Sequence, residues 1–79
     1  MPLVRLCDLS LDFTGVLRQN NCGGGVLQRF LDLGLVRGTR ITQLFSAPGG
    51  DPRAYFFRGV VVAIRNADAA QILTEYIDI

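Results

Sequence analysis

The sequence predicts an α+β fold, mainly β, in which about five strands form a small, partly closed barrel with one inserted helix and a short helical turn before the last strand. The chain has 79 residues, which is room for a single domain over residues 1–79. Its apolar fraction of 49% is enough for a core and argues against disorder. Its β-prone runs are short and separated by glycine and proline, so closing the sheet is the economical way to hide strand edges.

The first half of the chain predicts a strand and then the inserted helix. After a lead-in over residues 6–11, apolar and polar residues alternate over 13–19 as in a half-buried strand. The run 20–25 is rich in glycine and stops any regular element. It lacks the lysine of a phosphate-binding loop, so we interpret it as a turn. Apolar residues then recur every three or four positions over 26–33, which indicates a helix with one buried face.

Two glycines mark the path from the helix into the next strand. Gly34 follows the last helical residue and can take the left-handed conformation that ends a helix. Leu35 is then placed to fold back on the last helical turn. Gly38 supplies a tight turn before a β-prone run over 39–45. We therefore expect the second strand to start directly after this turn.

A loop and a hairpin follow the second strand. The loop signal consists of Pro48, Gly49, Gly50, Asp51 and Pro52. We interpret Asp51 as a cap of the local turn, because a catalytic carboxylate needs an ionisable partner and a pocket. Strands are predicted over 54–58 and 60–64, with Gly59 in the tight connection between them.

The C-terminal part predicts a short helix and a last strand. Residues 66–68 can cap a helix over 68–73 that turns Ala69, Ile72 and Leu73 inward. A final short strand is predicted over 74–77.

Charge and hydropathy narrow the classes of function. Eight arginines against seven acids give a formal net charge of +1, spread along the chain, which is poor support for nucleic-acid binding. No signal-peptide pattern is seen, and no apolar run approaches the roughly 20 residues that span a bilayer. We therefore expect a cytoplasmic protein that does not insert into the membrane.

The two cysteines do not predict a catalytic or cofactor site. Cys7 and Cys22 stand in a chain without histidine, so a nucleophilic thiol would lack its usual base. We expect both thiols to be reduced and partly buried. A disulfide between them is an alternative if the protein lies in an oxidising compartment. A zinc site would need carboxylates or a second copy of the chain to supply the missing ligands. No catalytic, metal or cofactor residue is predicted.

Several short motifs together resemble a known family. They are Leu-Asp-Leu-Gly-Leu at 31–35, Gly-Thr at 38–39, Ala-Pro-Gly-Gly-Asp-Pro at 47–52, Arg-Gly at 58–59 and Ala-Ile-Arg at 63–65. From Leu6 to Tyr76 the chain resembles the FeoA family, small cytosolic accessory proteins of bacterial ferrous iron transport. The resemblance implies an SH3-like β-barrel with an inserted helix. It also implies a non-enzymatic partner of the membrane transporter FeoB, bound at its cytosolic GTP-binding part.

The chain departs from the family pattern at some positions. Arg37 stands where proline is common, and Gly49 stands where leucine is common. Phe45, Phe56 and Val61 fall where outward polar residues are expected.

These three apolar residues predict a partner-binding surface. If Tyr55 and Phe57 face the core, strand alternation turns Phe56 outward. Together with Phe45 and Val61 it would form one exposed patch, and such patches usually mark interfaces. The hypothesis is self-association into a homo-oligomer or docking on a partner. The alternative is a β-bulge that turns some of these side chains inward.

Two other classes of function stay open at this point. The same fold ends DtxR-type repressors, so a stand-alone regulatory or peptide-binding domain is one alternative. No helix-turn-helix region precedes it in this sequence, so we expect an accessory protein instead. A small-barrel nucleic-acid binder is the other alternative, because Tyr55, Phe56 and Phe57 could stack bases.

Overall fold

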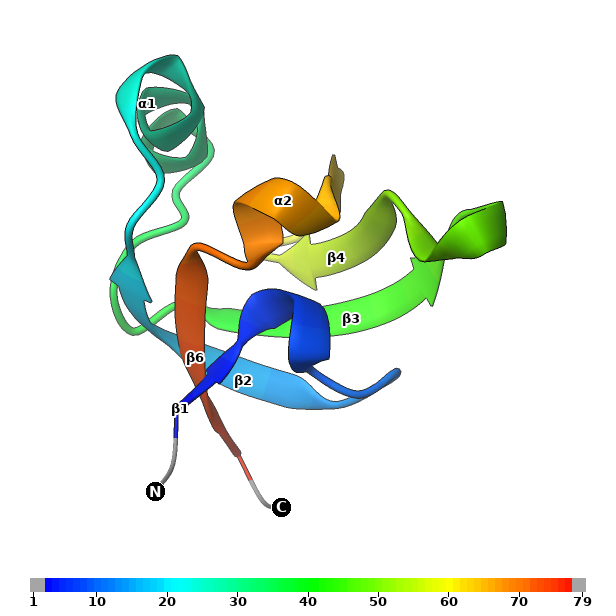
Figure 1. The fold of residues 1–79 in the computed structure, drawn as a ribbon. Helices are drawn as coiled ribbons and strands as arrows, with labels where there is room; N and C mark the ends of the chain where they lie inside the picture. The colour runs from blue at the N-terminus through cyan, green and yellow to red at the C-terminus, as the bar shows by residue number, and fades with distance from the viewer. Residues whose placement is uncertain (1–2, 78–79) are drawn as a thin grey trace.

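The computed structural model describes residues 3–77, which form one antiparallel sheet with short helical segments between its strands (Figure 1). Among these residues the sheet has six strands in the order β1-β6-β2-β3-β4-β5. In chain order the elements are β1 (Leu3–Arg5), η1 (Leu6–Asp8), β2 (Thr14–Asn20), α1 (Gly24–Asp32), β3 (Arg40–Ser46), η2 (Pro48–Gly50), β4 (Arg53–Phe57), β5 (Val60–Ile64), α2 (Asn66–Ala69) and β6 (Ile72–Tyr76). The prediction of a mainly β, α+β fold with one inserted helix is confirmed.

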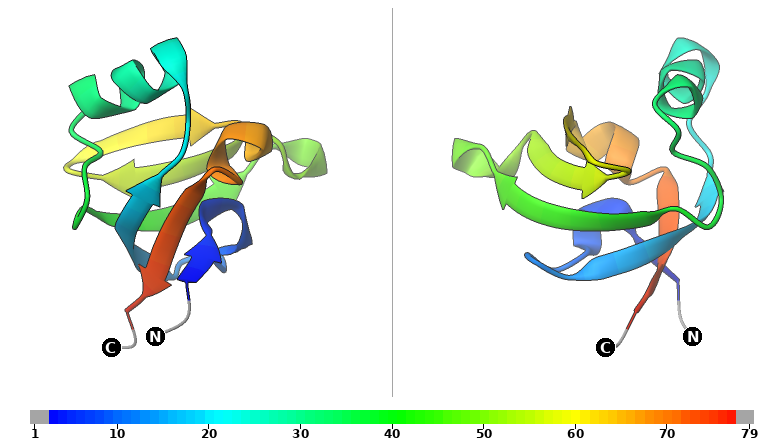
Figure 2. Two further views of the ribbon diagram at one scale, coloured as in Figure 1. Left: turned by 60° about the vertical axis from the view of Figure 1, so that its left-hand side comes forward. Right: turned by 180° about the vertical axis from the view of Figure 1, so that it is seen from behind.

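The sheet is strongly curled, and its concave side holds the core (Figure 2). The turn η1 and the helix α2 lie across the concave side, whereas α1 stands at one end of the molecule (Figures 1 and 2). The largest fully buried side chains are Tyr55, Phe57, Leu6, Leu9, Leu17, Leu35, Ile41, Ile64, Ile72 and Thr74. No helix of the described residues is long and apolar enough to cross a membrane.

The predicted strands are found with small shifts, and the sixth strand is new. The expected strand over 39–45 is β3, and the expected strand over 60–64 is β5. The additional strand is β1, which pairs antiparallel with β6 at one edge of the sheet. It is only three residues long, so it gives no periodic signal in the sequence.

The predicted C-terminal helix over 68–73 is wrong in its bounds. The helix α2 begins at Asn66 and ends at Ala69, and Ile72 already belongs to β6. Ala69 and Ile72 are buried as predicted, whereas Leu73 is half-buried. Ile72 and Leu73 are in a strand because their backbone pairs with β2, and this tertiary pairing overrides the local helical pattern.

The helix α1 is terminated by Gly34 in the left-handed conformation, as predicted from the sequence. Gly34 has φ +89° and donates its N–H to the carbonyl of Leu31, while Leu35 donates to the carbonyl of Phe30. This pair of bonds is the Schellman motif, and Leu35 and Phe30, the residues that usually make its apolar contact, both belong to the core.

The expected buried face of α1 is only partly buried. Phe30 is the one fully buried residue of the helix, and Leu27 is half-buried. Leu31 remains 43% exposed and Val26 remains 38% exposed. The reason is that α1 meets the end of the curled sheet rather than lying flat on it (Figure 2). Part of its apolar stripe therefore lines a groove or faces solvent.

The buried phenol of Tyr55 makes stability sensitive to high pH. Its hydroxyl donates to the carbonyl of Leu6 at 3.4 Å, and burial raises the pKa of Tyr55 to about 12 from 10.0. The folded state therefore holds the proton more tightly than the unfolded state. This contribution is fully present below pH 10 and is lost as the pH rises to 12.

We expect the free energy of unfolding to fall by about 2 to 3 kcal/mol over this range through Tyr55. Urea unfolding at a series of pH values measures this fall. Tyr55→Phe should show a smaller fall, whereas Tyr76→Phe, which leaves Tyr55 in place, should keep it. An equal fall in native protein and Tyr55→Phe would contradict the assignment.

Candidate interaction surfaces

The strand register brings Phe45, Phe56 and Val61 to the same convex face of the sheet. Phe56 pairs directly with Thr42 of β3 and with Val61 of β5. Phe45 pairs with Ala54, which lies two residues before Phe56 on β4 and therefore on the same face. A bulge interrupts the register between Gln43 and Phe45.

The three residues are all exposed, and we call them the outer patch. Phe45 is 59% exposed, Phe56 43% and Val61 57%. Their strand neighbours Tyr55 and Phe57 are buried on the other face, as strand alternation requires. The outer patch therefore consists of apolar groups from three adjacent strands, side by side on the surface. The burial of Tyr55 and Phe57 leaves Phe56 as the exposed aromatic residue of β4, so the base-stacking platform of three residues does not exist.

The loop before β4 holds α2 in place. The carboxylate of Asp51 accepts a hydrogen bond from the backbone N–H of Asn66 at 3.0 Å. The side-chain amide of Asn66 donates in return to the carbonyl of Gly50 at 2.9 Å. The interpretation of Asp51 as a cap of its own turn is therefore wrong: its carboxylate caps the N-terminus of α2, where a negative charge is favourable. Gly50 and Asp51 serve the fold here.

The remaining predicted turns also have identifiable geometry. Gly38 has φ +92° and donates its N–H to the carbonyl of Leu17 at 2.7 Å. Arg58 and Gly59 both have positive φ and form the two-residue connection of the β4–β5 hairpin. Such turns match the twist of the flanking strands. These positions shape the barrel end that carries α1.

The cysteines are both free thiols. Cys22 is buried, and its Sγ donates to the carbonyl of Asp68 at 3.4 Å. Burial raises the pKa of the Cys22 thiol, which disfavours a reactive thiolate. Cys7 is half-buried beside Asp8. Within residues 3–77 no group of three or more histidine, cysteine or acidic side chains gathers as metal ligands.

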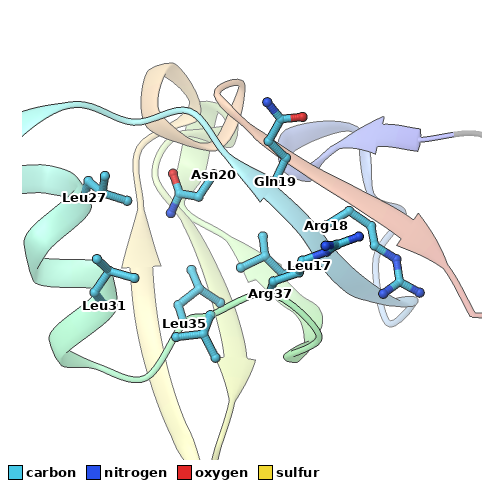
Figure 3. A pocket seen from close by; sticks show the side chains of 9 residues that line it. Leu17, Arg18, Gln19, Asn20, Leu27, Leu31, Leu35 and Arg37 are labelled. Atoms are coloured by element: carbon cyan, nitrogen blue, oxygen red, sulfur yellow. The ribbon is translucent and has the colours of Figure 1, made fainter.

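A groove between α1 and the end of β2 was not predicted from the sequence. It has a volume of about 260 Å³. Figure 3 shows the side chains that line it: Leu17, Arg18, Gln19, Asn20, Leu27, Leu31, Leu35, Val36 and Arg37. Leu31 was expected in the buried helix face, and Asn20 in a turn. No local signal marks this groove, because it exists only where the helix meets the sheet.

The fold and these surfaces define a small β-barrel-like domain that offers apolar contact surfaces. A family model, described as the FeoA domain, matches residues 4–76. The chain therefore belongs to the FeoA domain family.

Solved structures of FeoA proteins have the same fold. The solution structure of FeoA from Chlorobium tepidum has 28% sequence identity and a TM-score of 0.90, over 95% of this chain and 71% of that one. The FeoA-like protein from Clostridium acetobutylicum has 28% identity and a TM-score of 0.87, over 100% and 92%. FeoA from Stenotrophomonas maltophilia, described as a prokaryotic SH3 domain protein in complex with zinc, has 22% identity and a TM-score of 0.78, over 89% and 87%.

The fold also occurs within a larger regulator. A manganese-dependent transcriptional repressor matches with a TM-score of 0.85 over 96% of this chain, but over only 42% of its own length and with 16% identity. This likeness shows a shared fold. Among curated proteins there is no match.

Proposed function

We propose that this protein is a non-enzymatic, cytoplasmic accessory protein of ferrous iron uptake that binds the cytosolic GTP-binding part of an FeoB-type transporter. The observation that carries the proposal is the FeoA family match over residues 4–76. FeoA from Stenotrophomonas maltophilia, which has a similar structure, is described as a candidate activating factor of ferrous iron transport.

The outer patch is the proposed contact surface. Phe45 and Phe56 present aromatic rings, and aromatic residues are enriched in protein–protein interfaces. Val61 pairs with Phe56 and extends the surface onto the edge strand β5. Docking there would bury side chains that are now in water, which is favourable at roughly 25 cal/mol per Å² of apolar area. Binding needs no catalytic group, so the mechanism is protein–protein contact.

We expect Phe56→Asp to abolish transporter binding while leaving the fold intact. A buried carboxylate without a partner is costly at an interface, whereas Phe56 makes little contribution to the core. The measurement is a pull-down with tagged protein from the membranes of the source cell, with and without guanine nucleotide, read by mass spectrometry. Native protein should recover the transporter, and Phe56→Asp should not.

The matched control is Val26→Asp, which adds the same charge at a comparably exposed residue of α1. It should recover the transporter as native protein does. Equal recovery by Phe56→Asp would refute the outer patch as the contact surface. Recovery of soluble regulators alone would favour a regulatory domain instead. Light scattering on both variants separates docking from self-association, because only a homo-oligomer would change its mass.

A further inference from the structure

The groove between α1 and β2 lies apart from the outer patch and has its own chemistry. The buried Leu17 and Leu35 line it together with the exposed Leu31 (Figure 3). Val36, which is also exposed, completes the apolar lining. Water is therefore in contact with aliphatic side chains that a ligand could cover. The volume of about 260 Å³ is below the roughly 300 to 1,000 Å³ of small-molecule sites, so it suits one or two side chains.

The charged residues that line the groove are both arginines. Arg18 binds Glu75 through its Nε at 2.7 Å, so its charge is already paired. Arg37 has no ion pair with any residue in the part of the chain that the structure describes. No acidic side chain lines the groove. Arg37 therefore makes the groove complementary to a carboxylate.

Asn20 supplies an unused hydrogen-bond donor at the same place. Its Oδ1 accepts the backbone N–H of Cys22 at 3.0 Å, which fixes the orientation of the carboxamide. The Nδ2 is then directed toward the space between Leu27 and Leu31 (Figure 3). It is buried and has no hydrogen-bond partner among residues 3–77. A buried donor without a partner is costly, so an acceptor from a ligand that displaces the side chains covering Nδ2 would be stabilised here.

We propose that this groove binds a short peptide segment of a partner protein that combines an aliphatic side chain with a carboxylate. The aliphatic side chain would contact Leu31 and Val36. A carbonyl or carboxylate oxygen would accept from Asn20, and Arg37 would pair with the acid. This second binding surface goes beyond the proposed function and does not depend on the identity of the transporter.

The test uses the full chain and a displayed library of random linear peptides. Enriched peptides are synthesised with a fluorescent label, and their affinity is measured by anisotropy. We expect them to share an aliphatic residue close to aspartate or glutamate. Leu31→Gln and Arg37→Glu should each weaken binding about tenfold. Asn20→Asp keeps the oxygen that accepts from Cys22 but removes the donor, and it should weaken binding similarly.

Val26→Gln is the matched control, because it makes the same kind of change on α1 outside the groove. It should leave the affinity unchanged. The proposal is overturned if no peptide is enriched, or if the selected peptides lack the acid. It is also overturned if binding is lost in Phe56→Asp but not in the groove variants. If light scattering shows that native protein is a dimer and that Leu31→Gln is a monomer, the groove binds a second copy of the chain. That result would also overturn the proposal.

Discussion

Replacing Gly34 with alanine is expected to lower the free energy of unfolding by about 1 to 3 kcal/mol. Two separate costs add. The first is the backbone, because Gly34 has φ +89°, which a residue with a Cβ rarely adopts. The second is steric and smaller, because a Cβ built on Gly34 would lie 2.7 Å from Nε and 2.8 Å from Cδ of Arg58, whose exposed, flexible side chain must move aside. Urea unfolding followed by circular dichroism measures the loss.

Gly38→Ala is the control that separates these costs. Gly38 has φ +92°, close to that of Gly34, but no atom lies within 4 Å of its added Cβ. It should therefore show the backbone cost alone and lose less stability than Gly34→Ala. Adding Arg58→Ala to Gly34→Ala should recover the steric part. Equal losses for Gly34→Ala and Gly38→Ala would contradict a steric cost at Gly34.

The parts of this fold that were predictable are those set by neighbours in sequence. The alternation of Tyr55, Phe56 and Phe57 reports which side of the sheet each faces, because strand side chains alternate with a period of two. Gly34 indicates a helix end because few residues other than glycine tolerate the left-handed conformation that it adopts there. Gly59 reports the hairpin for the same reason. Each of these signals needs only a few residues to be read.

The errors arise where distant segments decide the outcome. Asp51 looks like a local turn residue, but its carboxylate accepts a hydrogen bond from Asn66 across the open end of the β4–β5 hairpin. This bond supports a helix start two residues earlier than the predicted start at Asp68. Leu73 follows a helical pattern, but pairing with Gln19 places it in a strand. No single-sequence pattern contains these partners.

The same distinction applies to the candidate surfaces. The exposure of Phe45, Phe56 and Val61 agrees with strand alternation, although their role in binding stays a proposal. The groove depends on the angle at which α1 meets the sheet, which the apolar spacing of the helix does not encode. Leu31 has the periodicity of a core residue and still lies at the surface.

Replacing Phe57 with alanine is expected to cost about 3 to 5 kcal/mol, whereas Phe56→Ala should cost less than about 1 kcal/mol. The two residues are adjacent and chemically identical. Phe57 is 1% exposed inside the core, so its loss leaves a cavity lined by side chains that cannot fully collapse. Phe56 is 43% exposed on the other face, so its removal mainly shortens a surface side chain.

A chain of 79 residues has a total stability of roughly 4 to 12 kcal/mol, so the Phe57→Ala loss takes a large share of it. We therefore expect a population of unfolded Phe57→Ala protein near room temperature and a native-like melting curve for Phe56→Ala. Thermal and urea unfolding of the pair measure this directly. Similar losses at both positions would place both rings in the core. The outer patch would then have no exposed aromatic at its centre, and both the register of β4 and the docking proposal that rests on it would fail together.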